Sequence, residues 1–308
     1  MNIYGFWDRG LESSPEIVKR CFDRWGALNP AHEVKVFDRD DAVRALAEFP
    51  DWVARLPPQG LSDILRIHLL AADGGIWVDA TSLPVVALDD WLPAAMERSG
   101  FFAFAGGAWS PFRAFDNWFL ASSPGSTLVR ILDSEARAFW DRPRELHPVS
   151  SPHERRQPRV RGIRRLVRRL SKSEHERWAA AYRKNPRWSV GPEGRETKFY
   201  PYFWTHFLVD RLLETDGEFR FRWESTPIFS QYLTHVVQSA RGARAAEHPE
   251  FLAALPTALA ASPVHKLNWR VSWPDALFSM QPNQAVLLPR AQKDPGSVAA
   301  DPNVLTVG

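Results

Sequence analysis

Cysteine is nearly absent from the 308-residue chain, and long apolar runs are missing. The one thiol, Cys21, has no partner for an intrachain disulfide, so we interpret it as a buried hydrophobic side chain in a reducing compartment. No stretch approaches the roughly 18 uncharged apolar residues that a membrane span needs. The N-terminus also lacks a basic segment followed by an apolar run. We therefore expect a cytoplasmic protein without a signal peptide.

Acidic residues are missing from one basic segment. Between Arg155 and Lys172 the chain has nine Lys or Arg and no Asp or Glu, although the net charge of the whole chain is only +3. Nucleic-acid binding is one interpretation of such a segment. However, the segment contains none of the aromatic residues that stack on bases. We therefore expect no nucleic-acid partner.

The same segment carries apolar residues at helical spacing, namely Ile163, Leu166, Val167 and Leu170. Arginines occupy the other faces, so the pattern predicts an amphipathic helix within an insertion at 143–174. One interpretation is reversible binding to an anionic membrane surface, on the inner face of the cytoplasmic membrane. The other is a surface helix that packs its apolar stripe on the rest of the protein.

Hydrophobic residues make up 44% of the chain, which is enough for a sizeable core. Expected strands lie at 3–7, 33–37, 76–78, 101–105 and 118–121, and expected helices begin after Ser14, at Asp40 or Asp41, at 63 and at 127. Because strands alternate with helices, we predict an α/β fold with a mainly parallel sheet flanked by helices. We expect one domain over 1–288, with the basic helical insertion, and an irregular C-terminal tail over 289–308.

The most distinctive motif runs from Ser62 to Thr81 and reads SDILRIHLLAADGGIWVDAT. Asp63 and Arg66 share a helix face, and a helix capped by Ser62 would place both near its first turn. Asp79 follows an apolar strand, at whose carboxyl end ligands gather in parallel sheets. This arrangement suits a diphosphate with a hard cation. The alternative is structural: Asp63 caps the helix, Arg66 pairs with it, and Asp79 begins a turn.

The motif resembles the capsular polysaccharide synthesis protein family among the DXD-containing sugar transferases. That family has an Asp-x-x-Arg helix, a Gly-Gly turn and an apolar strand that ends in Asp-Ala-Thr or Asp-x-Asp. Further landmarks follow in the family's order, at Ile3–Trp7, Pro15–Lys19, Asn29–Val34, Asp116–Ser122 and Pro263–Trp269. The resemblance covers roughly residues 1–140 and 197–270.

The resemblance implies a GT-A type, Rossmann-like glycosyltransferase. Such an enzyme moves a sugar from a nucleotide-sugar donor, here expected to be a UDP-sugar, to an acceptor. The implied acceptor is a glycan or lipid-linked glycan of a capsule, O-antigen or related surface polymer. The implied cofactor is Mn²⁺ or Mg²⁺, which prefer oxygen ligands.

The resemblance also implies residue roles. The expected catalytic residues are Asp79, Asp116 and Asn117. The expected donor-binding residues are Trp7, Asp63, Arg66, Gly74, Gly75 and Lys266. The expected metal ligands are Asp79, Thr81 and His265. Because Thr81 stands where a strict Asp-x-Asp motif has its second aspartate, a catalytically degenerate sugar-binding module is an alternative.

Overall fold

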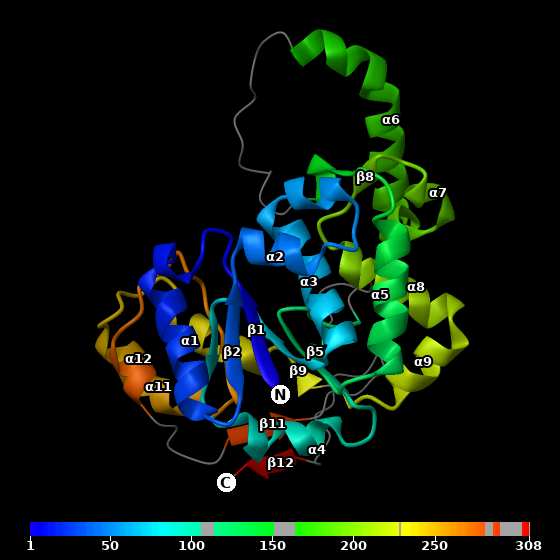
Figure 1. Cartoon of the computed structure of the whole chain (residues 1–308). Coiled ribbons are helices and arrows are strands. Elements are labelled where there is room, and N and C mark those ends of the chain that lie inside the picture. Colours follow the sequence, from blue (N-terminus) through cyan, green and yellow to red (C-terminus); the bar gives the residue numbers. More distant parts are fainter. Residues whose placement is uncertain (106–113, 151–163, 228, 281–285, 290–303, 308) are drawn as a thin grey trace.

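The computed structural model describes residues 1–105, 114–150, 164–227, 229–280, 286–289 and 304–307 (Figure 1). A six-stranded sheet forms its centre. Its strands are β1 (Asn2–Phe6), β2 (Glu33–Phe37), β3 (Gly75–Val78), β5 (Phe101–Ala105), β6 (Phe119–Ser122) and β9 (Phe229–Ser230). The order is β2-β1-β3-β6-β5-β9, and only β6 runs antiparallel to its neighbours. The predicted α/β class with a mainly parallel sheet is therefore confirmed.

Helices cover both faces of this sheet (Figure 1). The longer ones are α1 (Glu16–Leu28), α3 (Pro58–Ala72), α5 (Thr127–Phe139), α6 (Arg164–Lys184), α8 (Trp204–Thr215) and α11 (Pro249–Leu259). The shorter ones are α2 (Arg39–Ala45), α4 (Leu92–Met96), α7 (Pro192–Arg195), α9 (Gly217–Glu224), α10 (Val236–Arg241) and α12 (Ala276–Ser279). Short 3₁₀ helices lie at Leu11–Ser13, Asp51–Arg55, Leu88–Asp90, Pro148–Ser150, Pro186–Val190 and Leu233–His235.

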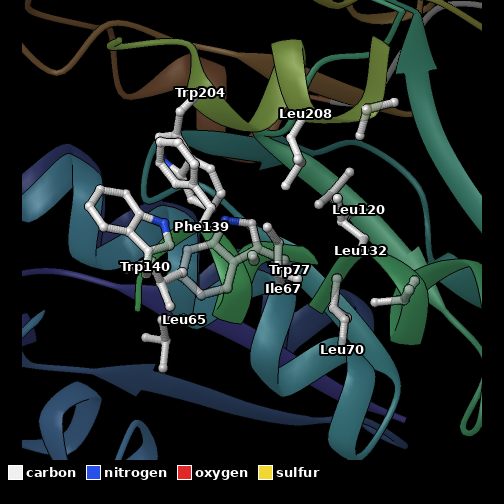
Figure 2. Packing of buried hydrophobic residues seen from close by; sticks show 14 of the residues in the cluster. Leu65, Ile67, Leu70, Trp77, Leu120, Leu132, Phe139, Trp140, Trp204 and Leu208 are labelled. Atoms are coloured by element: carbon white, nitrogen blue, oxygen red, sulfur yellow. The ribbon is translucent and has the colours of Figure 1, made fainter. Parts of the chain in front are cut away.

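The core has two large hydrophobic clusters, because successive side chains of a strand point to opposite faces. Trp77 of β3 lies in the cluster under α3, α5 and α8, whereas Val78 lies in the cluster under α1 and α4. Figure 2 shows part of the first cluster, which includes Trp77, Phe139 and Trp204. The rings of Phe139 and Trp204 stack with centroids 5.6 Å apart. Each buried side chain of this size contributes about 1.5–3 kcal/mol.

The start of α3 differs from the prediction. The helix begins at Pro58 rather than at Asp63, because proline has no N–H to lose and its fixed φ suits the first turn of a helix. Ser62 therefore lies inside the helix and does not cap it. Asp63 and Arg66 fall in the second and third turns, so the helix-capping interpretation of Asp63 is wrong.

Two other helix starts also need correction. Ser14 does not cap α1, which follows Pro15 directly. The cap of α2 is Asp38, not Asp40 or Asp41, because its carboxylate accepts the N–H of Asp41 at 2.8 Å. In both cases the helix begins within two residues of the predicted start.

Three small sheets complete the fold. Strand β4 (Ser82–Pro84) pairs antiparallel with β10 (Val264–Lys266), and β7 (Glu145–Leu146) pairs parallel with β8 (Phe199–Tyr200). Strand β11 (Val286–Pro289) pairs antiparallel with β12 (Val304–Val307). The expectation of an irregular tail is therefore wrong for Val304–Val307, whose β-branched residues favour a strand once β11 supplies a partner.

The predicted basic helix is confirmed from residue 164 onward, as α6; residues 151–163, and the side chains of 164–173, lie outside the described part of the chain. The C-terminal half of α6 is anchored by Trp178, which is buried and stacks on His147 with ring centroids 4.3 Å apart. The N-terminal half extends away from the body of the protein (Figure 1). Within the described residues, the structure has no helix of the length and apolarity that crossing a membrane requires.

Candidate active site

Arg66 is the centre of a polar cluster at the carboxyl edge of the sheet, with only 5% of its side chain exposed. Its Nη2 lies 3.2 Å from Asp63 Oδ1 and 3.4 Å from Asp79 Oδ1. It also donates to the Ser62 hydroxyl at 2.7 Å, and Nη1 donates to the carbonyl of Asn117. A short turn joins α3 to β3, so the N-terminal half of this helix lies beside the end of the strand. The cluster thus joins α3, β3 and the segment before β6.

Asp79 directly follows β3, as predicted. Its N–H donates to the carbonyl of Trp118 at 2.8 Å, which fixes the backbone beside β6. Its Oδ2 accepts from Lys266 Nζ at 2.7 Å. Burial acts to raise the pKa of this carboxyl, but Lys266 and Arg66 outweigh it and hold the pKa below its usual value. Asp79 is therefore a carboxylate at neutral pH, shared between two cations.

Lys266 and His265 occupy adjacent positions on β10, so their side chains point to opposite sides. Lys266 reaches Asp79, and its ammonium lies 5.8 Å from the centre of the Trp118 ring. His265 is fully buried, and its Nε2 lies 3.0 Å from the carbonyl oxygen of Leu259. Burial lowers the pKa of His265 to about 4. The structure brings Lys266, and not His265, to the site.

The three predicted metal ligands do not converge. Asp79 lies at the sheet edge, His265 lies in the interior, and the Thr81 hydroxyl donates to the carbonyl of Leu267 at 2.9 Å. In the described ranges, no group of three or more His, Cys, Asp or Glu side chains is placed to hold a metal ion. The donor set of Asp79, Thr81 and His265 therefore does not fit a metal centre. Mn²⁺ or Mg²⁺ dependence stays a prediction.

Asp63 is buried against Arg66 and has a raised pKa. Burial raises the pKa to about 6, although the charge of Arg66 and a hydrogen bond from Asn117 act to lower it. That bond runs from Asn117 Nδ2 to Asp63 Oδ1 at 3.0 Å. A carboxyl group with a pKa near neutrality is suited to exchange a proton or to donate a hydrogen bond.

The two residues predicted from the Asp116-Asn117 pair have different surroundings. Asn117 belongs to the cluster, because its side-chain amide donates both to Asp63 and to the Thr205 hydroxyl at 3.0 Å. Asp116 is buried, with only 1% of its surface exposed, and its N–H donates to the carbonyl of Phe104 at 2.9 Å. The structure thus joins Asn117 to Asp63 and Arg66 and places Asp116 beside β5.

Two tryptophan rings meet at this edge of the sheet. Trp7 follows β1 at the same edge of the sheet, and its backbone N–H donates to the carbonyl of Phe37 at 3.0 Å. Its ring meets that of Trp269 edge to face, with centroids 6.1 Å apart. Trp269 lies three residues after Lys266 and is 43% exposed. An exposed indole at this position can stack on a sugar or a base.

The glycine pair has a structural role away from the site. Gly74 and Gly75 have φ of 68° and 106°, which side chains rarely adopt. A Cβ on Gly74 would lie 2.5 Å from the backbone nitrogen of Pro124, and one on Gly75 would lie 2.8 Å from the carbonyl oxygen of Asn2. The pair turns the chain into the N-terminal end of β3, whereas Asp79 follows the C-terminal end. The structure does not bring these glycines to the cluster.

Three side chains of the cluster were not predicted as site residues. The Ser62 hydroxyl accepts a hydrogen bond from Arg66. Because the two residues are four apart on one helix, their spacing in the sequence could have predicted this contact. Trp77 donates to Asp79 Oδ1 at 3.3 Å, from two residues earlier in the chain. Thr205 lies 88 residues from Asn117, and nothing in the sequence connects the two.

Comparison with known proteins agrees with the sequence pattern. The Capsular polysaccharide synthesis protein family matches residues 1–147. Glycosyltransferase afumC of Aspergillus fumigatus is 26% identical over 164 residues, covering 46% of this chain and 40% of that protein, so the chain spans less than half of that relative. PaToxG Glycosyltransferase, a solved structure, covers 44% of this chain and 59% of its own at 14% identity, with a TM-score of 0.33. The predicted resemblance is confirmed for the first part of the chain: residues 1–147, which include Asp63, Arg66 and Asp79, match the capsular polysaccharide synthesis protein family. The match does not extend to the predicted second part, residues 197–270.

Proposed function

We propose that this protein is a GT-A type glycosyltransferase that moves a sugar from a nucleotide-sugar donor to an acceptor hydroxyl. The observation that carries the proposal is the meeting of Arg66, Asp79 and Lys266 at the carboxyl edge of the sheet. The exposed indole of Trp269 contacts Trp7, which follows β1 at the same edge of the sheet. The family match over residues 1–147 and the name of the Aspergillus relative support this reaction class.

The leaving group of such a reaction is a nucleoside diphosphate, which gains negative charge as the sugar bond breaks. A cation held where that charge develops stabilises the transition state. Lys266 suits this role better than Arg66, because 21% of its side chain is exposed against 5% for Arg66. Asp79 orients the ammonium through the 2.7 Å bond, and Arg66 in turn supports Asp79.

The proposed donor is a UDP-sugar, and the proposed acceptor is a glycan or lipid-linked glycan of a capsule, O-antigen or related polymer. The family match is the support for both. Trp7 and Trp269 would provide apolar surface for the base or a sugar ring.

A panel of nucleotide sugars tests the reaction and the metal together. We expect release of the nucleoside diphosphate from at least one sugar donor, measured with and without Mn²⁺ and with a chelator. Activity that survives chelation would contradict the predicted metal dependence but leave glycosyl transfer intact. Absence of release from every donor, with acceptor sugars present, would contradict the proposed function.

A second candidate is a sugar-binding module without turnover. It is favoured by one observation: the Thr81 hydroxyl already bonds to Leu267, so it does not replace the missing second aspartate. Donor turnover, rather than binding, separates the two candidates. A module would bind a nucleotide or sugar and release no diphosphate.

We further propose that the N-terminal half of α6 binds the inner face of the cytoplasmic membrane. Support comes from the density of arginine in Arg164–Arg169 and from the way this half extends from the body (Figure 1). Each basic residue near an anionic surface is worth about 1 kcal/mol. Wild type should sediment with anionic vesicles at low salt, and a variant with Arg164, Arg165, Arg168 and Arg169 changed to Gln should not.

The matched control removes the same charge elsewhere on the surface. It changes four exposed arginines, Arg44, Arg130, Arg220 and Arg222, to Gln. This control should still sediment with the vesicles. Equal loss of sedimentation in both variants would mean that net charge, and not α6, determines the binding.

A further inference from the structure

Helix α8 buries polar side chains as well as apolar ones. Thr205, His206 and Asp210 are 1%, 3% and 8% exposed. A buried polar group costs free energy unless it has a partner, so its partner indicates what it is for. All three side chains contact one short segment, residues 114–117, which leads into β6.

The contacts follow each other along that segment. Asp210 Oδ1 accepts the N–H of Ala114 at 3.3 Å. The ring of His206 lies against that of Phe115, with centroids 5.3 Å apart and 30° between the planes. Thr205 Oγ1 accepts from the Asn117 amide at 3.0 Å.

The opposite side of Asn117 belongs to the charged cluster. Its amide gives one hydrogen to Thr205 and the other to Asp63, so the two acceptors together fix the plane of the amide. The backbone carbonyl oxygen of Asn117 accepts a hydrogen bond from the Arg66 guanidinium. Helices α3 and α8 therefore hold the same residue from two sides.

We propose that Thr205 and Asp210 are positioning residues of the active site. Thr205 orients the Asn117 amide toward Asp63, and Asp210 holds the start of the segment through Ala114. The inference rests on the proposed glycosyl transfer. It deepens that proposal by adding residues of α8, which lies outside residues 1–147 that match the family. The site is thus completed by a helix from the second half of the chain.

Asp210 is suited to hold a backbone N–H in an apolar setting. Burial raises its pKa to about 7, so near neutrality a large fraction of the group is the uncharged acid. The acid form accepts the N–H of Ala114 through its carbonyl oxygen. Asp210→Asn keeps that acceptor and the neutral shape, whereas Asp210→Leu removes the acceptor.

Thr205→Val removes the hydroxyl at nearly constant volume, and Thr205→Ser keeps it. We expect Thr205→Val to lower kcat about tenfold, because the loss of one buried hydrogen bond has about this effect. The change in the donor KM should be smaller. Thr205→Ser should restore kcat. Thr226 provides the control, because it is equally buried and its hydroxyl bonds to the carbonyl of Arg222, away from the segment. Thr226→Val should lose stability but not turnover.

Hydrogen exchange provides a readout that does not depend on catalysis. Amides of residues 114–118 should exchange faster in Thr205→Val and Asp210→Leu, and at the wild-type rate in Asp210→Asn and Thr226→Val. Unchanged exchange and turnover in Thr205→Val, or a loss that Thr205→Ser does not restore, would overturn the proposal. If wild type turns over no donor, the proposed function fails, while the exchange rates still show whether α8 holds the segment.

Discussion

Asp79→Ala is expected to lower sugar transfer by about 10²-fold or more, because one side chain holds both Lys266 and Arg66 at the site. Asp79→Asn should behave similarly, since an amide cannot offset two positive charges. The measurement is nucleoside diphosphate release under saturating donor, with folding confirmed by circular dichroism. A folded Asp79→Asn protein with near-normal turnover would remove Asp79 from the mechanism.

Asp133→Asn is the matched control for Asp79. Asp133 is also a shielded carboxylate with a lowered pKa, and it pairs with Arg137 at 2.7 Å on α5. Both wild-type carboxylates have folded pKa values below the usual 3.8, so each adds stability above about pH 4 that is lost as pH falls through the folded pKa. Both variants should lose that stability. Only the Asp79 variant should lose turnover.

Arg66→Met is expected to have the largest effect on stability. The guanidinium bonds to Ser62 and Asn117 and pairs with two carboxylates, all within the protein. Removing one partner from a buried ion pair typically costs about 3–5 kcal/mol. We therefore expect Arg66 to contribute to stability as well as to the predicted donor binding. Arg66→Lys keeps the charge but loses the planar fork, so it should also weaken donor binding.

Arg144→Lys separates the two effects. Arg144 is also buried, and its guanidinium donates to the carbonyls of Phe139 in α5, Arg195 in α7, and Thr197 between α7 and β8. Both lysine variants should melt earlier in thermal unfolding. Below the melting transition, calorimetry should show weaker donor binding for Arg66→Lys alone. Equal donor affinity in the two variants would limit Arg66 to a structural role.

Local patterns in the sequence were sufficient to predict most of the helices and strands up to about residue 140. Strand β2 and strand β5 agree with the prediction residue for residue, because alternation and composition are properties of neighbouring residues. The pairing of Asp63 with Arg66 also follows from their spacing on one helix. The place of Asp79 after a buried strand was predicted for the same reason. The start of α3 differs from the prediction because a proline, which interrupts a helix at interior positions, here occupies the first turn.

The sequence by itself determined the α/β class, the order of most elements up to about residue 140, and the places of Asp63, Arg66 and Asp79 on their helix and strand, since each depends on residues within a helix or strand or directly beside it. The tertiary structure decided which distant groups join that array. Lys266 reaches Asp79 across 187 residues, and His265 turns away, because the pairing of β10 with β4 fixes which side of the strand faces the sheet edge. Thr205 joins Asn117 because α8 packs on the same core as α3. Contacts of this kind depend on how layers pack, and no short sequence pattern contains that information.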